Sequence, residues 1–343
     1  MTQLFTSPKT DVRIGLLANR AAERATFKLY QERRPENTQR AQRAAIKVFT
    51  KFMQSIGLGV ADLYSEPFAW SGITWGIVQA FQRWQIREGY AMKTVNDRIS
   101  IIKVYMALAN QAGIIPDGEI IRLQSMRGYS RKESVDMDTK REKESIPTRI
   151  GNKKRTPTLI TDEQARQLCM VRNETPQALR DALMMCLALD HGLRVSELAA
   201  LKVENLDLKT RQMTFYRQKT GTFSKHNLRG RAWACLVNYL KVQTAKSGPL
   251  LLASCKTGAL VIGKGLVERS INERLKQLGL SIGIQDLSPH DCRHYGATKA
   301  GNDPHVSLAA LMSWGGWTSP QNAARYINKG DADNDGVKLG IDG

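Results

Sequence analysis

Five consecutive residues, His290 to His294, combine two histidines, an aspartate, a cysteine and an arginine within the stretch "SPHDCRHYGAT". Histidine, aspartate and cysteine are common metal ligands, so the cluster could form a metal site. Histidine and arginine are also suited to binding a phosphate or another anion. His290 and Arg293 are three residues apart, which places both side chains on one face of a helix. The choice between the two kinds of site depends on what the rest of the chain supplies.

Four more residues of the second half have side chains suited to anion chemistry. Arg194 lies in "HGLRVSEL", Lys219 in "RQKTGT", Trp317 in "SWGGWTS" and Tyr326 in "NAARYI". Taken singly, each is typical of a structural position. An arginine before an apolar helix or a lysine on a turn is usually exposed, and a tryptophan or tyrosine usually anchors a core. None of them alone predicts a function.

The order of these residues is more specific than any one of them. An arginine, a lysine on a hairpin, a His-x-x-Arg pair, a Gly-Gly-Trp-Thr motif and a final tyrosine resemble the catalytic series of the tyrosine recombinases, the phage integrase family. The matching stretches are "GLRVSELAAL", "RQKTGT", "LSPHDCRHYGAT" and "LMSWGGWTSPQNAARYI". The resemblance covers essentially the whole catalytic domain, and "AMKTVNDRISIIKVYMALANQAGI" looks like the core-binding domain of the same family.

The resemblance implies a covalent mechanism on DNA. Tyr326 would attack a phosphodiester, expel a 5′-hydroxyl and form a 3′-phosphotyrosine. Arg194 and Arg293 would bind the non-bridging oxygens, where charge builds up in the transition state, because arginine stays charged and donates paired hydrogen bonds. Glu197 is expected to hold Arg194 or His290 in place. With this much positive charge at the phosphate, no metal ion or other cofactor is expected.

Three further residues are expected to transfer protons or donate hydrogen bonds. His290 would bind the same phosphate and take the proton of the nucleophile. Lys219 would protonate the leaving 5′-oxygen. Trp317 has only an indole N–H, so it can donate to the phosphate and pack but cannot transfer protons. Lys225 and Lys264 are alternatives to Lys219, whose position on the hairpin favours it.

The composition agrees with a polyanionic partner. The 343-residue chain has a net charge of +19 and a pI of about 9.9, which favours nucleic acid. A basic membrane-binding protein is the alternative, but no apolar run reaches the roughly 18 residues that span a bilayer. We therefore expect a cytoplasmic, nucleoid-associated protein with no membrane partner and no small-molecule substrate. Its 5 cysteines, without a C-x-x-C, predict reduced thiols.

Periodicity predicts a mainly α fold with a small β-hairpin, and the family resemblance implies an arrangement of two domains that clamp DNA. Residues 20–126 are expected to form a helical, SAM-like core-binding domain. Residues 127–158 have the charge and low apolar content of a basic linker, part of which can be helical. Residues 159–328 are expected to form the α+β catalytic domain. The apolar stripe that best predicts a helix of the first domain comprises Val95, Ile99, Ile102, Met106 and Ala109.

Three local signals position the candidate site within the catalytic domain. Thr161 followed by Gln164 is a capping-box pattern that begins a helix. A second helix is expected over 178–189. Two short strands are expected on either side of the turn at 219–221, which makes a hairpin.

Basic residues of the first domain and the linker are the candidates for DNA contacts. The sequence "KT" at 93–94 stands where proteins of the resembled family enter DNA. A merely solvated basic face is the alternative for each residue. The candidates are Lys93, Thr94, Arg98, Lys103, Arg40, Arg43, Lys47, Lys153, Lys154 and Arg155.

The tail, residues 329–343, has two interpretations. Its aspartates are spaced as in a calcium-binding loop, but the twelfth position is Asp342 rather than glutamate and Lys338 replaces an apolar residue. The family resemblance implies instead that the tail contacts a neighbouring protomer, and we favour this interpretation.

The leading hypothesis is a site-specific DNA recombinase. It would act as a homo-tetramer on two double-stranded DNA sites and exchange strands through a Holliday junction, in integration, excision or resolution. The alternatives are a type IB topoisomerase-like nicking and closing enzyme, a non-catalytic DNA-binding protein on the same fold, and a metal-dependent nuclease. The core-binding domain argues against the first alternative, and the complete set of candidate residues argues against the second.

Overall fold

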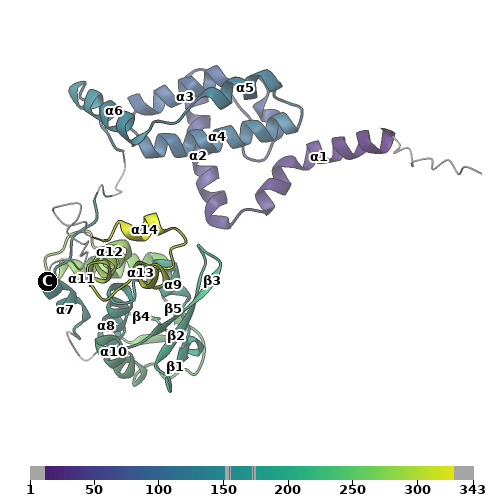
Figure 1. Ribbon diagram of the computed structural model, residues 1–343. Helices are drawn as coiled ribbons and strands as arrows, with labels where there is room; N and C mark the ends of the chain where they lie inside the picture. Colours follow the sequence, from purple (N-terminus) through teal and green to yellow (C-terminus); the bar gives the residue numbers. More distant parts are fainter. Residues whose placement is uncertain (1–11, 151–153, 155, 172, 174, 328–343) are drawn as a thin grey trace, which may run out of the picture. The chain divides into compact units, whose positions relative to one another are not determined.

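The computed structural model describes residues 12–150, 154, 156–171, 173 and 175–327. The chain divides into two compact units, Met1–Lys153 and Lys154–Gly343 (Figure 1). The described residues are mainly helical with small antiparallel sheets, which confirms the fold class expected from the sequence. None of the described helices is long and apolar enough to cross a lipid bilayer.

The first unit consists of helices and their connecting loops. Its α-helices are α1 (Val12–Glu32), α2 (Glu36–Ser55), α3 (Trp75–Arg87), α4 (Met92–Gln111), α5 (Asp117–Ser125) and α6 (Arg131–Lys143), with a 3₁₀ turn at Pro67–Trp70. The expected stripe on α4 is buried at all of its positions from Val95 to Ala109. Aromatic rings fill the space beside it, with Phe49 centred 5.9 Å from Trp70 and 4.9 Å from Phe81. Burial of this apolar surface holds the unit together.

The charged segment 127–158 contains α6, which packs on the rest of the first unit. Arg141 is buried on this helix and donates hydrogen bonds to the carbonyl oxygens of Ile86 and Tyr90, the latter at 2.8 Å. Ser130 begins α6 with a capping box that includes Glu133. One buried arginine therefore attaches a segment whose composition is typical of a solvated tether.

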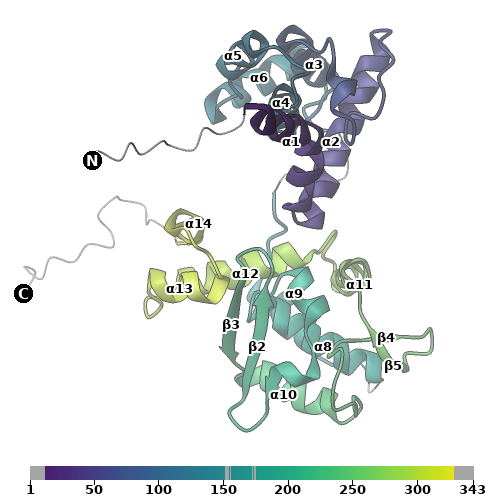
Figure 2. The ribbon, with the colours of Figure 1, turned by 90° about the vertical axis from the view of Figure 1, so that its right-hand side faces the viewer.

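The second unit surrounds one largely buried helix. Its helices are α7 (Asp162–Cys169), α8 (Pro176–Leu189), α9 (Val195–Ala200), α10 (Gly230–Leu240), α11 (Glu268–Leu280), α12 (Pro289–Gly301), α13 (Leu308–Gly315) and α14 (Pro320–Ala324), with a 3₁₀ turn at Val203–Asn205. Its strands are β1 (Leu206–Asp207), β2 (Gln212–Arg217), β3 (Thr222–Asn227), β4 (Leu252–Ser254) and β5 (Leu260–Gly265). They form one antiparallel sheet of order β1-β2-β3 and a separate β4-β5 pair, and Figure 2 shows β2 and β3 side by side.

Helix α8 is the centre of this unit, and it is buried from Arg180 to Leu189. Helix α12 comes close to it at Gly296, where a side-chain carbon would overlap the carbonyl oxygen of Leu189. A glycine here lets the two helices approach without strain. This contact sets the position of α12 against α8, and α12 carries two of the candidate site residues.

The local predictions for this unit are confirmed. Thr161 and Gln164 form the capping box of α7, the helix expected over 178–189 is α8, and the two strands flank the turn at 219–221. All 5 cysteines are free, and Cys255 is the exposed one.

Candidate active site

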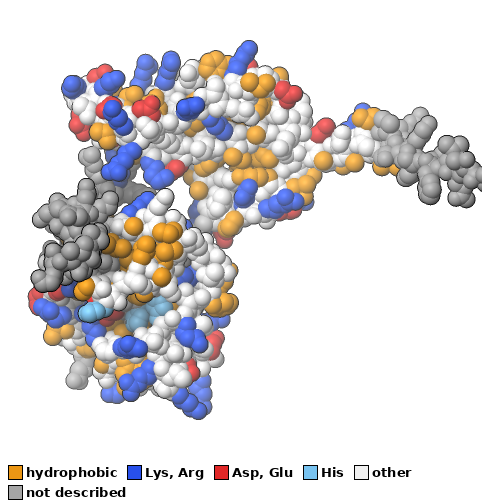
Figure 3. All heavy atoms as spheres, in the orientation of Figure 1, with side chains coloured by type: hydrophobic (Ala, Val, Ile, Leu, Met, Phe, Trp, Pro, Cys, Tyr) orange, Lys and Arg blue, Asp and Glu red, His pale blue; other side chains and the backbone are white. Residues whose placement is uncertain are grey.

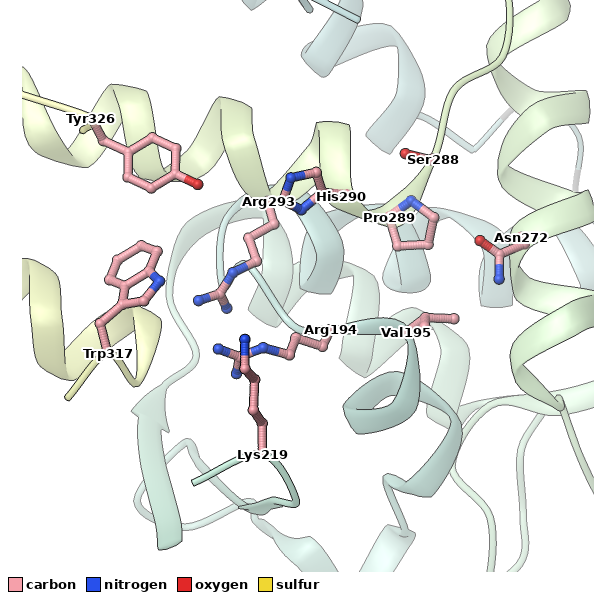
Figure 4. Close-up of a pocket in the computed structure, with 10 residues that line it drawn as sticks. All are labelled: Arg194, Val195, Lys219, Asn272, Ser288, Pro289, His290, Arg293, Trp317 and Tyr326. Atoms are coloured by element: carbon pink, nitrogen blue, oxygen red, sulfur yellow. The ribbon is translucent and has the colours of Figure 1, made fainter. Parts of the chain in front are cut away.

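A pocket of about 360 Å³ lies in the second unit. It is lined by Arg194, Val195, Lys219, Asn272, Ser288, Pro289, His290, Arg293, Trp317 and Tyr326, so every residue expected to be catalytic reaches it. In Figure 4 the guanidinium groups of Arg194 and Arg293 and the ammonium group of Lys219 lie close together, and the Tyr326 hydroxyl points toward them. Three cationic groups and one hydroxyl are suited to binding a phosphate and attacking it.

Each of these side chains comes from the end of an element. Arg194 is the N-cap of α9, Lys219 lies in the turn between β2 and β3, and His290 and Arg293 lie on α12. Trp317 follows the left-handed Gly316 that ends α13, and Tyr326 follows α14. Residues distant in the sequence therefore meet at the ends of helices and at a turn.

Glu197 orients Arg194. Its carboxylate is almost completely buried and accepts hydrogen bonds from the Arg194 backbone N–H at 2.8 Å and from Arg194 Nη1 at 2.7 Å. An arginine held at both its backbone and its side chain presents its other donors in a fixed direction. Of the two partners expected for Glu197, the structure places Arg194 in contact.

Arg293 is buried and held by the backbone. It donates to the carbonyl oxygen of Gly192 at 2.7 Å and to that of Gly315, and its guanidinium lies 4.7 Å from the centre of a Trp317 ring. Burial, followed by the nearby charge of Arg194, lowers its pKa to about 10. Arg293 therefore remains cationic at neutral pH while being partly shielded from water, which strengthens its attraction for an anion.

Tyr326 lies between two rings. Its ring centre is 5.3 Å from that of Trp317 and 5.2 Å from that of His294. At Gly301 a side-chain carbon would overlap the Tyr326 backbone, so the end of α12 and the tyrosine segment approach closely. Burial, followed by the nearby His290, lowers the pKa of His294, which favours the neutral form of this ring beside the tyrosine.

The hairpin presents Lys219 to the pocket, whereas its two alternatives lie elsewhere. Lys219 is exposed on the turn. Lys225 lies on β3 opposite Thr214, and Lys264 lies on β5; neither residue lines the pocket.

Asp291 and Arg217 show what the motif analysis missed. Asp291, which the phosphate-site interpretation leaves without a role, is buried and accepts hydrogen bonds from Ser288, from Lys154 Nζ at 2.6 Å and from the Thr158 N–H at 2.9 Å. Burial opposes ionisation, but these hydrogen bonds hold the pKa of Asp291 below its usual range. The Ser-x-x-Asp spacing of a capping box could have revealed this role.

Arg217 is fully buried, and its place in line with the inward-facing Met213 and Phe215 on β2 was the available signal.

Several proposed DNA contacts already have protein partners. Lys93 pairs with Asp97 at 2.9 Å, Arg98 lies 4.2 Å from the Tyr90 ring centre, and Lys103 donates to the carbonyl oxygen of Met126. Burial lowers the pKa of Lys103 and that of Arg98. Arg98 and Lys103 are therefore weaker candidates than the exposed Lys93.

The remaining proposed contacts are distributed over α2, α4 and the linker. Arg40 pairs with Glu36 at 3.3 Å, Arg43 lies 4.9 Å from the Tyr64 ring centre, and Lys47 is exposed. Thr94 is half-buried on α4, and Lys154 pairs with Asp291. Lys153, Arg155 and the tail 329–343 lie outside the described residues.

Lys and Arg side chains are spread over the visible face of each unit and outnumber the acidic ones (Figure 3). Among the described residues, no three His, Cys, Asp or Glu side chains are arranged to hold a metal ion.

Comparison with known proteins identifies the class of molecule. The sequence profile of the phage integrase family matches residues 158–332, more than half of the chain. The chain belongs to the phage integrase family. It is a tyrosine recombinase, an enzyme that breaks and rejoins DNA strands in site-specific recombination.

Individual relatives agree with this assignment. Tyrosine recombinase XerC of Roseiflexus castenholzii is 27% identical over 266 residues, which cover 75% of this chain and 72% of that protein. The type 1 fimbriae regulatory protein FimB of Escherichia coli is 31% identical over 100 residues, which cover 29% of this chain and 49% of FimB.

Solved structures share the fold. A lambda integrase bound as a dimer to a COC′ core site has a TM-score of 0.61 and 16% identity, with 92% of this chain and 97% of that one covered. The Tn1549 transposon integrase in complex with transposon right end DNA has a TM-score of 0.59 and 13% identity, with 92% and 96% covered.

Proposed function

We propose that the protein recombines DNA through a covalent 3′-phosphotyrosine. The Tyr326 hydroxyl oxygen attacks the scissile phosphorus, the bond to the 5′-oxygen breaks, and the strand leaves as a 5′-hydroxyl. A 5′-hydroxyl of the partner strand then attacks the phosphotyrosine and releases Tyr326, so no phosphodiester energy is lost. The observation that carries the proposal is the convergence of Tyr326 with two arginines and a lysine in one pocket.

Arg194 and Arg293 form the phosphate clamp, a name used below for these two side chains. Charge increases on the non-bridging oxygens in the transition state, and donors that are already oriented stabilise it without reorganising. Glu197 supplies that orientation for Arg194, and the carbonyl oxygens of Gly192 and Gly315 supply it for Arg293. Trp317 adds an indole N–H from the other side of the pocket.

Two separate proton transfers accompany the cleavage. His290 accepts the phenol proton of Tyr326 as the attack proceeds, and Lys219 donates a proton to the departing 5′-oxygen. Both are exposed, so both can meet DNA that covers the pocket. The exposed position of Lys219 on the turn suits a residue that must reach the leaving group.

We propose three further features by analogy with the relatives. The described basic residues of the first unit bind the duplex backbone, where phosphate contacts fix position rather than sequence. Four protomers assemble on two DNA sites and exchange the strands in pairs through a Holliday junction, and the tail 329–343 contacts a neighbouring protomer. The lambda and Tn1549 integrases, which share the fold, were solved bound to recombination-site DNA.

The test is covalent capture. The protein is incubated with fragments of the source genome, denatured, and the attached DNA is sequenced, with Tyr326→Phe as the control. We expect adducts enriched in one sequence with wild-type protein and none with the phenylalanine variant. Adducts with Tyr326→Phe, or no adduct on any fragment, would contradict the mechanism. Relaxation of supercoiled plasmids that lack the captured sequence would favour a type IB topoisomerase-like activity instead.

A further inference from the structure

Arg217, which ends β2, has no access to solvent and does not line the pocket. A guanidinium has five N–H donors, and here each has an acceptor. Nε donates to Ser224 Oγ at 2.6 Å, and Nη2 donates to the Trp314 carbonyl oxygen at 2.7 Å. Nη1 lies 3.4 Å from Glu197 Oε1 and 3.3 Å from the Gly315 carbonyl oxygen.

The fifth donor of Arg217 contacts His226. The Nε2 atom of His226 lies 3.3 Å from Arg217 Nη2, and the Nδ1 atom of His226 lies 3.3 Å from Nδ1 of His191. Burial, followed by the charges around it, lowers the pKa of His226 to about 3, so the ring is neutral. In the tautomer with its hydrogen on Nδ1, His226 accepts from Arg217 and donates to His191.

Two acceptors of Arg217 are also the acceptors that orient the phosphate clamp. Glu197 accepts from both Arg217 and Arg194, and the Gly315 carbonyl oxygen accepts from both Arg217 and Arg293. One buried guanidinium thus links the supports of the two side chains that would bind the phosphate. A shift of Arg217 moves both acceptors, and through them both clamp residues.

The same side chain contacts two other parts of the site. Ser224 lies on β3, whose hairpin turn carries Lys219, and the Trp314 and Gly315 carbonyl groups precede Trp317. At Gly316 the backbone has a φ of +59°, and a side-chain carbon there would overlap Arg217 Cδ. Gly316 therefore gives Arg217 the room to reach the backbone, and Gly315 gives room to the Trp317 ring.

We propose that Arg217 is the positioning residue of the phosphate clamp. It touches no DNA and sets the directions of Arg194 and Arg293 through their shared acceptors. This inference rests on the proposed function, because it assigns a role in the clamp's binding of the scissile phosphate. Lysine cannot replace arginine here, because an ammonium group has three N–H donors and cannot bond to all five acceptors.

The test compares two substrates in single-turnover cleavage with saturating full-length protein. Both are duplexes of the captured sequence, one with a normal phosphodiester at the cleaved position and one with a methylphosphonate, which lacks one charged oxygen. Arg217→Lys is expected to slow adduct formation on the phosphodiester by about 100-fold, the usual consequence of misplacing an oriented group by about 1 Å. On the methylphosphonate the loss relative to wild type should fall to about 3-fold, because less charge needs to be stabilised. The Kd for DNA should change by less than about 2-fold.

Arg180→Lys is the matched control. Arg180 is equally buried, but it donates to Asp181, Leu252 and Ser254, away from the pocket. Its effect on cleavage should be the same on both substrates and under about 3-fold. Ser224→Ala, at a half-buried position, is the second variant in case Arg217→Lys does not fold. It should lose about 5-fold on the phosphodiester only.

The outcomes separate the two proposals. Equal losses on the two substrates, for Arg217→Lys or for Ser224→Ala if that variant must be used, would show that Arg217 supports only the fold, and the inference would be wrong. An unimpaired Arg217→Lys enzyme would overturn it as well. If neither wild type nor Arg180→Lys forms an adduct on any DNA, the proposed function itself fails.

Discussion

Replacing Glu197 with glutamine removes a buried negative charge shared by two arginines. Glu197 Oε1 forms ion pairs with Arg194 Nη1 at 2.7 Å and with Arg217 Nη1 at 3.4 Å. The carboxylate and Arg217 are both almost completely buried. Glutamine keeps one acceptor oxygen but turns an N–H group toward the guanidinium donors. Breaking a buried ion pair by removing one partner costs about 3–5 kcal/mol. We expect about 3 kcal/mol, because Arg217 keeps its acceptors at Ser224 and Trp314.

Urea unfolding and adduct formation measure the two consequences. With a denaturant dependence of about 2 kcal/mol per molar urea, the loss shifts the unfolding midpoint of the second unit by about 1.5 M. Adduct formation should slow by about 100-fold, because Arg194 loses its fixed direction. Glu163→Gln is the control, since its pair with Arg166 is exposed and such pairs contribute little. A Glu197→Gln protein that unfolds within about 0.5 kcal/mol of wild type would refute the reasoning.

Three other predictions follow from the geometry. Folding lowers the pKa of His226 from 6.5 to about 3, so the neutral ring stabilises the fold fully above pH 6.5. At pH 5 the unfolded chain binds a proton that the folded protein does not, and the free energy of unfolding should fall by about 2 kcal/mol. Urea unfolding should show a smaller decline in His226→Gln. Gly296→Ala should lower the free energy of unfolding by about 3 kcal/mol through overlap with Leu189, whereas Gly118→Ala, with open space around the site, should leave it unchanged or raise it. Lys219→Ala should slow adduct formation by about 100-fold or more, and a substrate with sulfur in place of the leaving 5′-oxygen should restore the rate, because a thiolate leaves without a proton; no restoration would mean that Lys219 is not the acid.

The residues of the pocket could be predicted because their order along the chain is specific, even though each is ordinary by itself. Trp317 and Tyr326 are separated in sequence from Arg194 by more than a hundred residues, and no periodicity places them together. Only the family resemblance supplied that proximity. The elements were easier to predict, because the capping box of α7 and the stripe on α4 are local properties of the chain.

The role of Arg217 could not be predicted in the same way. An arginine on a hairpin strand is ordinarily exposed, and its burial depends on acceptors from Glu197 and from the backbone of α13, which are distant in the sequence. The partners of Lys103 and Arg98 were hidden for a related reason. Their basic character is visible in the sequence, whereas the carbonyl oxygen and the ring that engage them depend on how the helices pack.

The contacts of Asp291 give the second unit a mechanical property. Lys154, its first residue, and Thr158 both bond to this carboxylate, which lies in the first turn of α12 between His290 and Arg293. The first residues of the second unit are therefore bonded to the helix that presents the candidate site. A load carried by the linker would reach the phosphate-binding side chains through the contacts of Asp291 with Lys154 and Thr158.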